Sequence, residues 1–414
     1  MLRLISTLEV FLSDQFVWFQ IYFSFLSDYS LICVRIYLFL IQYEKVDDMT
    51  IFFKKIIADK IFLVTGGLAI LALLFGSVSP SDIDLKTIVS LLSLIIMVSI
   101  YEQLGILTYI ANLMIAKCAS IRMLTLVILL FSFIGSMIFT NDVAILTLVP
   151  IIFKISKKVS IPKIPVISLM TVYANLGSAI TPIGNPQDIY LASFYHLNFL
   201  SFMSLSLPIG LVSLISLFIS LLFFPKTKID SSLGEGDETQ AKGSLTLYIV
   251  TIFVLLGVLS IIPYLLAFVA SLAYAVYIDR RIHQKIDFSI ILTFINFFII
   301  VGAISRVPLV HEIILAMTHT KYSVFYSGVG ISQIISNVPA AVLLSKFTNH
   351  IPALYLGVTV GGLGTLIASL ANLLALRQYS LNTTDHTTLK FFYQFTLINI
   401  IYLAIFLIVG IVLL

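Results

Sequence analysis

Three consecutive polar residues, Thr140, Asn141 and Asp142, interrupt one of the most apolar stretches of the chain. Their side-chain oxygens could bind a cation, and the amino end of a helix that starts there could bind an anion. Asp142 is the only ionisable residue between Met123 and Phe153. Because a carboxylate is costly inside an apolar segment, its position favours a functional role over the simpler alternative, a helix cap.

A second polar string, NLGSAITPIGNP from Asn175 to Pro186, interrupts the apolar stretch from about 164 to 196. Glycine allows close approach of another backbone, and proline removes a backbone donor and breaks a helix. The string therefore predicts a broken helix whose unwound part could hold an ion or a solute. Its candidate binding residues are Gly177, Ser178, Thr181 and Asn185.

Both strings recur later in the chain in the same order, which predicts an internal repeat. Residues 336 to 340, SNVPA, correspond to 140 to 144, TNDVA, and residues 362 to 372, GLGTLIASLAN, correspond to 175 to 185, with Asn372 aligned to Asn185. The second set of candidate binding residues is Ser336, Asn337, Gly364, Thr365 and Asn372.

The elements that position these residues are transmembrane helices. Hydrophobic residues make up 60% of the chain and charged residues 11%, and the mean hydropathy is +1.10. Apolar runs near 60–78, 200–223, 244–261, 263–278, 288–305 and 391–414 are long enough for membrane spans. The stretch from Arg122 to Lys154 is too long for one span and has a basic residue at each end, which predicts a re-entrant hairpin with Thr140, Asn141 and Asp142 at its tip.

The predicted fold is an all-α polytopic membrane protein with two inverted repeats, each containing a re-entrant hairpin and a broken transmembrane helix. Residues 1–48 are an N-terminal extension that need not belong to the fold, 49–223 the first repeat, 224–243 a cytoplasmic linker, and 244–414 the second repeat. Basic clusters place loops 154–163 and 279–287 in the cytoplasm. Three spans lie between the last span of the first repeat, 200–223, and the second hairpin, and this odd number inverts the second repeat. Segments 103–119 and 307–319 would be corresponding interfacial arms, and the carboxyl terminus would lie outside.

Several other classes of protein lack support in the sequence. A GxxxxGK[ST] phosphate loop and an HExxH zinc motif are absent, so the chain is not expected to be an enzyme, although a partner ATPase stays open. Cys33 and Cys118 have no metal-ligand spacing, and a net charge of +4 gives no nucleic-acid signature. A channel is an alternative, but two broken helices favour alternating access.

The strings FTNDVAILTLVP, NLGSAITPIGNPQDIY, SNVPAAVLL and GGLGTLIASLAN resemble the ion-transporter superfamily that includes arsenite pumps, sodium/proton antiporters, and citrate and dicarboxylate transporters. The resemblance covers residues 49 to 414. It implies two hairpin tips that meet two broken helices, an elevator-like movement and a homodimer. Sodium-coupled dicarboxylate members carry Ser-Asn-Thr at both tips. Here the first tip is closer to the Ala-Asn-Asp of arsenite-pump-like anion permeases.

The expected function is ion-coupled secondary transport, across the plasma membrane, of a small inorganic or organic anion or oxyanion such as arsenite or citrate; a Na⁺/H⁺ antiporter is the alternative. No cofactor is expected, and the coupling ion would be H⁺ or Na⁺. Asn141, Asp142 and Asn337 are the candidate Na⁺ ligands.

Overall fold

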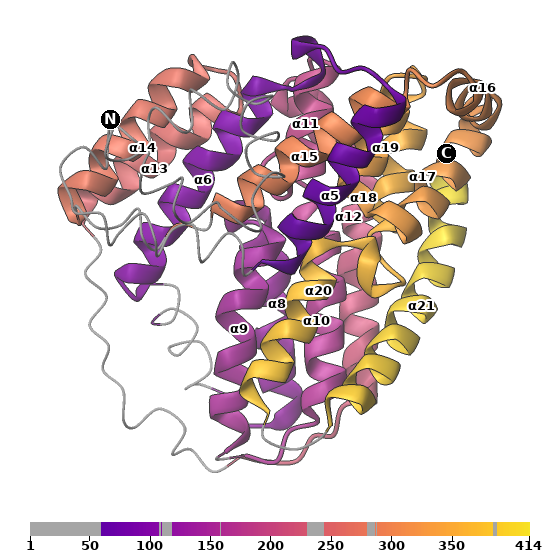
Figure 1. Cartoon of the computed structure of the whole chain (residues 1–414). Coiled ribbons are helices and arrows are strands. Elements are labelled where there is room, and N and C mark those ends of the chain that lie inside the picture. Colours follow the sequence, from indigo (N-terminus) through magenta and orange to yellow (C-terminus); the bar gives the residue numbers. More distant parts are fainter. Residues whose placement is uncertain are drawn as a thin grey trace, which may run out of the picture. The chain divides into compact units, whose positions relative to one another are not determined.

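The computed structural model describes residues 59–106, 109, 118–157, 159–229, 244–279, 286, 288–383 and 387–414. Within these ranges the chain forms helices joined by short links, with one isolated β-bridge between Ser120 and Lys228. It divides into two compact units (Figure 1), one from the described residues up to 83 together with 288–303, and one from 84–287 and 304–414. The expected extension 1–48 lies outside the described residues, as do most of the arm 103–119 and of the linker 224–243.

The smaller unit consists of α5 (Lys60–Phe75), the 3₁₀ turn η1 (Pro80–Asp82) and α15 (Phe288–Ile304). The side-chain amide of Asn296 donates a hydrogen bond of 3.1 Å to Thr65 Oγ1, so a buried polar pair joins α5 to α15. Gly76 lets the chain pass close to α15, because a Cβ there would lie 2.1 Å from the backbone oxygen of Ala303. This unit joins one helix of the predicted first repeat to one of the second.

The larger unit contains six membrane-type helices outside the hairpins and broken helices: α6 (Leu85–Gln103), α12 (Phe199–Ser220, continued by η2, Leu221–Phe223), α13 (Leu245–Val258), α14 (Tyr264–Ile278), α16 (Pro308–Met317) and α21 (Thr388–Leu413). Across the described residues, four helices are long and apolar enough to cross a membrane, or up to five if one bent pair counts as a span. α12 and α21 expose many large apolar side chains, as lipid-facing helices do. The chain is therefore a polytopic membrane protein, as the sequence predicts.

The two predicted hairpin tips have the same backbone geometry. Thr140 separates α8 (Ile121–Phe139) from α9 (Asn141–Ser156) with φ 78° and ψ 154°. Ser336 separates α17 (Lys321–Ile335) from α18 (Asn337–Ser345) with φ 77° and ψ 154°. Non-glycine residues rarely adopt this region, which costs about 1–3 kcal/mol. Two such turns at the two aligned positions show that the tips share one local structure.

Contacts along α10 (Lys163–Ser178) show that α8 and α9 run in opposite directions. Ser132 and Met137 of α8 bond to Met170 and Thr181 in turn, so α8 runs parallel to α10. Asn141, at the start of α9, instead bonds to Asn175 near the far end of α10. The other end of α9 lies at the start of α10, where the Lys163 ammonium is 4.9 Å from the Phe153 ring centre. α8 and α9 therefore form a hairpin.

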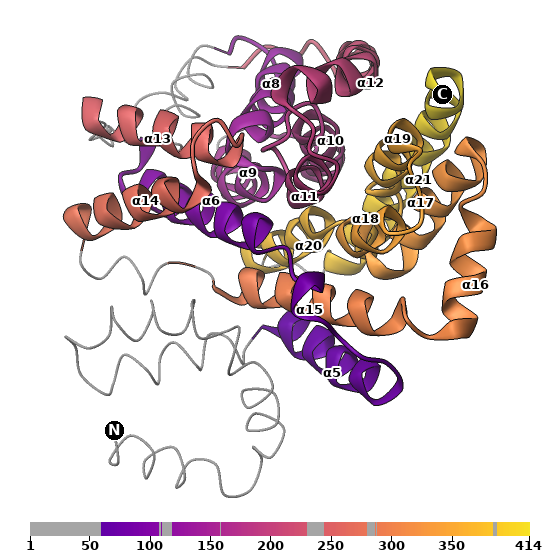
Figure 2. The same cartoon turned by 90° about the horizontal axis from the view of Figure 1, so that it is seen from above.

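α17 and α18 form a second hairpin against α19 (Ile351–Gly361). A Cβ on Gly357 would lie 2.7 Å from Phe325 O, and one on Gly361 would lie 2.6 Å from Ser332 Oγ, so α17 runs parallel to α19. The tip residue Asn337 lies against Gly362, just past the end of α19. In Figure 2, α17, α18 and α19 lie together, as do α8, α9 and α10.

Each hairpin is followed by a broken helix. α10 ends at Ser178, and the chain resumes as α11 (Pro186–Phe194). α19 ends at Gly361, and after the 3₁₀ turn η5 (Leu366–Ala368) it resumes as α20 (Leu370–Asn382). The residue after each first half has nearly the same conformation, Ala179 at φ −66° and Gly362 at φ −67°.

The alignment of Asn185 with Asn372 is wrong in its register. Asn185 is the N-cap of α11, and the N-cap of α20 is Ser369, in a similar extended conformation. Asn372 lies three residues later, inside the first turn of α20. The alignment matched two asparagines, but a residue's place in a helix is counted from the N-cap. One shared residue type is therefore not enough to align the two helices.

The two hairpins open toward opposite ends of the larger unit. α11 ends beside the open end of the second hairpin, because the Tyr195 hydroxyl donates to the backbone oxygens of Ser345 (3.2 Å) and Thr348 (2.8 Å). α20 extends toward the open end of the first hairpin, where the rings of Tyr379 and Phe153 are 5.3 Å apart. In Figure 1, α9 and α10 accordingly lie lower than α17, α18 and α19.

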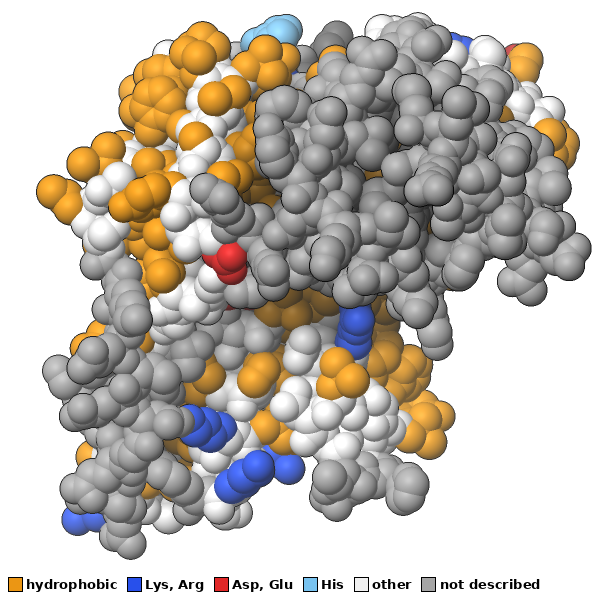
Figure 3. Space-filling view, turned by 60° about the vertical axis from the view of Figure 1, so that its left-hand side comes forward, with side chains coloured by type: hydrophobic (Ala, Val, Ile, Leu, Met, Phe, Trp, Pro, Cys, Tyr) orange, Lys and Arg blue, Asp and Glu red, His pale blue; other side chains and the backbone are white. Residues whose placement is uncertain are grey.

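Basic residues gather at the end where the first hairpin opens. Arg122, at the start of α8, donates to the backbone oxygen of Phe224 through Nε (2.8 Å) and Nη2 (2.6 Å). This basic end also includes Lys154, Lys157, Lys163, Lys226 and Lys228. In Figure 3, most of the blue side chains on the visible face lie in its lower half. The carboxyl terminus lies at the opposite end, where Lys321 Nζ is 2.6 Å from the Leu414 oxygen.

Candidate functional site

The first hairpin tip is hydrogen-bonded to the break between α10 and α11. The backbone N–H of Asn141 donates to Gly184 O (3.2 Å), and Thr181 Oγ1 donates to Met137 O (2.5 Å). Both bonds use backbone groups that a helix end leaves without an intrahelical partner. The tip and the break therefore satisfy each other's exposed backbone.

The second tip is held to its own break by Gln333 of α17. Its Nε2 donates to Gly361 O (2.7 Å) and Leu363 O (3.0 Å), and its Oε1 accepts from the N–H of Thr365 (2.9 Å). Thr365 Oγ1 returns a bond to Gln333 O (3.2 Å). Gln333 is three residues before the tip, as Met137 is in the first hairpin. In both halves a threonine of the break thus donates to the carbonyl three residues before the tip, and the Gln333 side chain adds further bonds in the second half.

Asn175, near the end of α10, joins the two halves. Its Oδ1 accepts from Asn141 Nδ2 (2.9 Å) and Ser369 Oγ (3.0 Å), and its Nδ2 donates to Asn372 Oδ1 (3.0 Å). Asn372 in turn donates to Gly362 O (3.1 Å) and Thr365 O (3.0 Å). These groups are almost fully buried, so the network fixes the tip of one half against the break of the other.

Asn337 borders the same network from the second tip. Its Oδ1 accepts a 3.4 Å bond from Ser336 Oγ, and its Nδ2 would lie 2.8 Å from a Cβ on Gly362. Because Gly362 O also accepts from Asn372, the two tips and the two breaks form one contiguous polar layer. We call this the asparagine layer: Asn141, Asn175, Asn337, Ser369 and Asn372.

At two of the predicted glycines, neighbouring parts of the chain come so close that a larger residue would not fit. A Cβ on Gly177 would lie 2.2 Å from Phe133 O, so only glycine lets α10 pack this closely on α8. Gly364 has φ +104°, and a Cβ there would lie 2.5 Å from Gln333 Oε1. Both glycines shape the site by letting backbones meet.

Asn185 and Ser178 act across the first break. Asn185 caps α11 by accepting from the N–H of Asp188 (3.0 Å), while its Nδ2 donates to Ser178 Oγ (3.0 Å). Their role in the structure is to hold the unwound segment in shape.

Two carboxyl groups are buried close to this segment. Asp142 is 8% exposed, and its Oδ1 has no hydrogen-bond partner among the described residues. Asp188 is fully buried, and within the same part of the chain neither of its carboxyl oxygens has a partner. These are the only acidic residues between 121 and 194. An unpaired buried carboxylate is costly, so each of these groups calls for a cation or a proton.

The polar layer has the elements of an ion and solute site. Four helices, α9, α11, α18 and α20, begin at it, and their amino ends favour anions. Four others, α8, α10, α17 and α19, end at it, and their carbonyls favour cations. No lysine or arginine lies in the tips or breaks, so an anion there would depend on helix ends, amides and a bound cation.

The predicted residues therefore meet, although not all at one point. Asn141, Asn337 and Asn372 are in the asparagine layer, with Thr140, Asp142, Ser336, Gly364 and Thr365 at its border, while Gly177, Ser178, Thr181 and Asn185 shape the first break. Sequence reasoning missed Asn175, Gln333, Ser369 and Asp188. Asn175 and Asp188 lie within the quoted string NLGSAITPIGNPQDIY, in which Asp188 is the only acid and Asn175 one of three amides.

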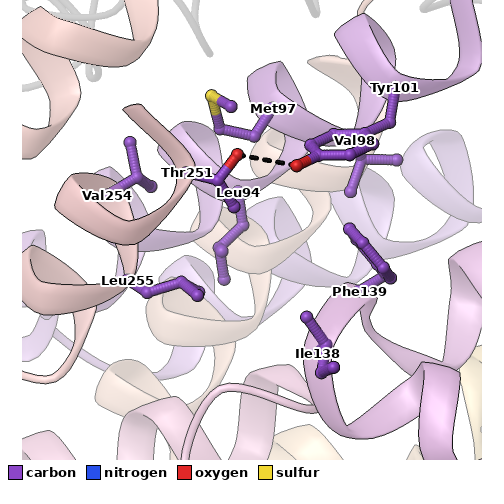
Figure 4. A pocket seen from close by; sticks show the side chains of 9 residues that line it. All are labelled: Leu94, Met97, Val98, Tyr101, Ile138, Phe139, Thr251, Val254 and Leu255. Atoms are coloured by element: carbon purple, nitrogen blue, oxygen red, sulfur yellow. Dashed lines mark hydrogen bonds between the residues drawn. The ribbon is translucent and has the colours of Figure 1, made fainter. Parts of the chain in front are cut away.

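An apolar crevice lies beside the first tip (Figure 4). Ile138 and Phe139, directly before Thr140, line it together with residues of α6 and α13. The crevice is narrow and partly open, with a volume of about 10 Å³ for water, room for about one molecule. Tyr101 and Thr251 form a 2.9 Å hydrogen bond in its lining. A crevice with this lining offers no site for an ion.

Paired hairpins and broken helices around a buried polar layer, in a polytopic helical chain, are typical of a membrane transporter. The comparison with known families agrees: the model of the family described as "Citrate transporter" matches residues 49–353. The chain belongs to this family.

Similar curated proteins are also named as transporters or membrane proteins. The uncharacterized transporter MJ0456 of Methanocaldococcus jannaschii is 33% identical over 326 residues, 77% of this chain and 88% of the relative. The inner membrane protein YbiR of Escherichia coli is 30% identical over 304 residues, 72% of this chain and 81% of the relative. The putative transporter arsB of Dictyostelium discoideum is 30% identical over 163 residues, 38% of this chain and 29% of the relative.

Proposed function

We propose that the chain is an ion-coupled secondary active transporter that moves a small anion or oxyanion across the plasma membrane by alternating access. The observation that carries this proposal is the asparagine layer, where both hairpin tips and both helix breaks meet beside the buried carboxyl group of Asp142. Helix amino ends supply the attraction for an anion, and the carboxyl group supplies the place for the coupling ion, H⁺ or Na⁺.

The two halves form an inverted repeat in this proposal. Their hairpins open toward opposite ends, and their tips share one backbone conformation. The basic end, with Arg122, Lys154 and Lys163, faces the cytoplasm according to the positive-inside rule. The carboxyl terminus would then be outside, and a reagent that cannot cross the membrane should label a cysteine at 414 but not one at 157 in intact cells.

For the substrate we propose an oxyanion such as arsenite, or a carboxylate such as citrate. The family description names citrate, and the name of one relative, arsB, together with the Thr-Asn-Asp tip, supports the arsenite-pump side of the superfamily. Na⁺/H⁺ antiport is the second candidate, and the buried acidic groups Asp142 and Asp188 favour it. A homodimer and a coupled partner ATPase are further proposals without a structural argument of their own.

The test is solute flux in proteoliposomes containing the full chain. Arsenite, citrate, succinate and Na⁺/H⁺ exchange are measured side by side under imposed proton and sodium gradients. Asp142→Asn should insert normally yet lose gradient-driven accumulation, because the amide keeps the shape of the carboxyl group and lacks its charge. Asn337→Ala should lower flux, since it removes an amide of the layer.

Val338→Ile is the matched control, because Val338 occupies the position of Asp142 in the second tip and has no side-chain oxygen. It should retain accumulation. Accumulation that survives in Asp142→Asn would reduce Asp142 to a structural residue and refute this coupling site.

A further inference from the structure

The carboxyl group of Asp188 has no role in the ion-coupled anion transport proposed above, in which Asp142 takes the coupling ion. It lies in the first turn of α11, with a side chain that is fully buried and two oxygens that accept no hydrogen bond. An aspartate at this position often caps a helix, but Asn185 already caps α11 by accepting from the N–H of Asp188. The carboxyl group is therefore not explained by capping.

Groups from both halves surround Asp188. Tyr355 of α19 lies close enough to interact with it electrostatically, and its hydroxyl donates to Ala179 O (2.8 Å) at the first break. Thr359, one helical turn further along α19, is 3% exposed, and its Oγ1 has no hydrogen-bond partner. Ser206 of α12 donates to the neighbouring carbonyl of Ile180 (2.6 Å). We call these residues, with Asp188, the α11–α19 cluster.

The cluster is rich in oxygen and contains no positive charge. α12, α18 and α19 contribute no lysine, arginine or histidine, and Tyr355 is the only ionisable residue among them. On α6, which also packs on α11, the ionisable residues Lys86, Tyr101 and Glu102 lie in its first and last turns. The carboxyl oxygens of Asp188 thus have no counter-ion and no hydrogen-bond donor among the described residues.

We propose that Asp188 is a second cation site, at which its carboxyl group takes up one monovalent cation, H⁺ or Na⁺, at the start of α11, the helix that packs on α18 of the second half. A sodium ion would use the Asp188 carboxylate, Thr359 Oγ1 and the second lone pairs of the Ala179 and Ile180 carbonyls. A proton would convert the carboxylate to a carboxylic acid. In both cases occupancy removes an unpaired charge between the two halves, so the cation strengthens their contact. This site rests on the proposed ion coupling and adds a second cation to it. It is tested by cation binding and needs no measurement of flux.

The test measures the carboxyl group itself by infrared spectroscopy, which separates carboxylic acid from carboxylate. The samples are the full chain in lipid nanodiscs, as wild type, Asp142→Asn, Asp142→Asn with Asp188→Asn, and Thr359→Val. Spectra are recorded with NaCl or choline chloride, at pH values where exposed carboxyl groups stay ionised. We expect Asp142→Asn to keep one carboxyl signal that responds to pH or to Na⁺, and the double variant to lose it.

The two cations give different results. If the site binds Na⁺, the signal changes with Na⁺ at constant pH, and Thr359→Val weakens that response at least tenfold. If it binds H⁺, the signal changes with pH alone, and Thr359→Val leaves it in place. Identical cation responses in Asp142→Asn and in the double variant would overturn the proposal. If the double variant fails to fold, Asp142→Asn alone still tests the proposal. The absence of any carboxyl signal that responds to pH or Na⁺ in Asp142→Asn would exclude a site at Asp188.

Failure of this proposal and failure of the proposed function are separate outcomes. The spectra need no substrate and no gradient. A responsive Asp188 in a protein that shows no coupled flux would retain the site and reject the transport mechanism. Coupled flux in a protein whose Asp188 signal does not respond to pH or Na⁺ would retain the transport mechanism and reject the site.

Discussion

Replacing Asn175 by alanine should destabilise the larger unit more than any other single amide substitution in the asparagine layer. The change removes the partner of three buried polar groups: Asn141 Nδ2, Ser369 Oγ and Asn372 Oδ1. Leaving a buried donor or acceptor without a partner costs about 1–3 kcal/mol for each group, and Ser369 and Asn372 keep other bonds, so we expect a loss of about 3–6 kcal/mol in total.

Thiol reactivity provides the assay. Cys118 is 5% exposed, and its burial raises the pKa of the thiol, so it reacts slowly with a maleimide dye until the protein unfolds. With Cys33 replaced by serine, Cys118 is the only cysteine left in the chain. The dye signal against denaturant concentration, in detergent micelles, then reports the unfolding free energy.

Asn399→Leu is the matched control. Asn399 is also fully buried, but its only hydrogen bond, 3.0 Å to Phe395 O, stays within α21, and its Oδ1 has no partner. Leucine should leave stability unchanged or raise it, because it removes a buried polar group that nothing satisfies. An Asn175→Ala protein within about 0.5 kcal/mol of wild type, the range of ordinary surface changes, would refute the idea that the layer holds the halves together.

Three further outcomes are expected. Gly177→Ala should lower the unfolding midpoint in the same assay, because the new Cβ meets the Phe133 carbonyl at 2.2 Å; an unchanged midpoint would mean that α8 and α10 are not packed this closely. Glycine at position 140 or 336 should raise the unfolding free energy by about 1 kcal/mol, since the positive φ strains any other residue, whereas alanine should not; equal effects of glycine and alanine would contradict the strain. A chain that starts at Met49 should insert and transport normally in proteoliposomes, and loss of either would show that the first 48 residues are needed.

Hydropathy and helix breakers were sufficient to predict the arrangement of elements. The apolar runs at 200–223, 263–278 and 288–305 became α12 with η2, α14 and α15, with ends within a residue or two. The polar residues at 140 and 336 also marked the turns, because an apolar helix contains such residues only where its backbone is interrupted. These signals depend only on residues that are neighbours in the chain, so they are visible in the sequence.

The partners of each side chain could not be predicted in the same way. Asn175 bonds to residues up to 197 positions away, and no local pattern distinguishes it from other asparagines in membrane helices. Gln333 and Met137 occupy equivalent positions but differ in side chain, so sequence similarity conceals their shared place. The alignment of Asn185 with Asn372 instead of Ser369 has the same cause. The sequence did not show which residue caps α20, and the alignment depends on that cap.

The two halves share the arrangement of their hairpin and broken helix but differ in their acidic residues. Residues 321–383 contain no acidic residue, whereas the first hairpin and its broken helix bury Asp142 and Asp188. Any movement of the first half along the membrane normal therefore carries two carboxyl groups through the electric field. One elementary charge moved across the whole membrane is worth about 2.3 kcal/mol per 100 mV. With both groups ionised the return of the empty carrier would depend on voltage. Cation binding at both would cancel the two carboxylate charges in the loaded step, so that only the charge of the bound solute would then respond to the membrane potential.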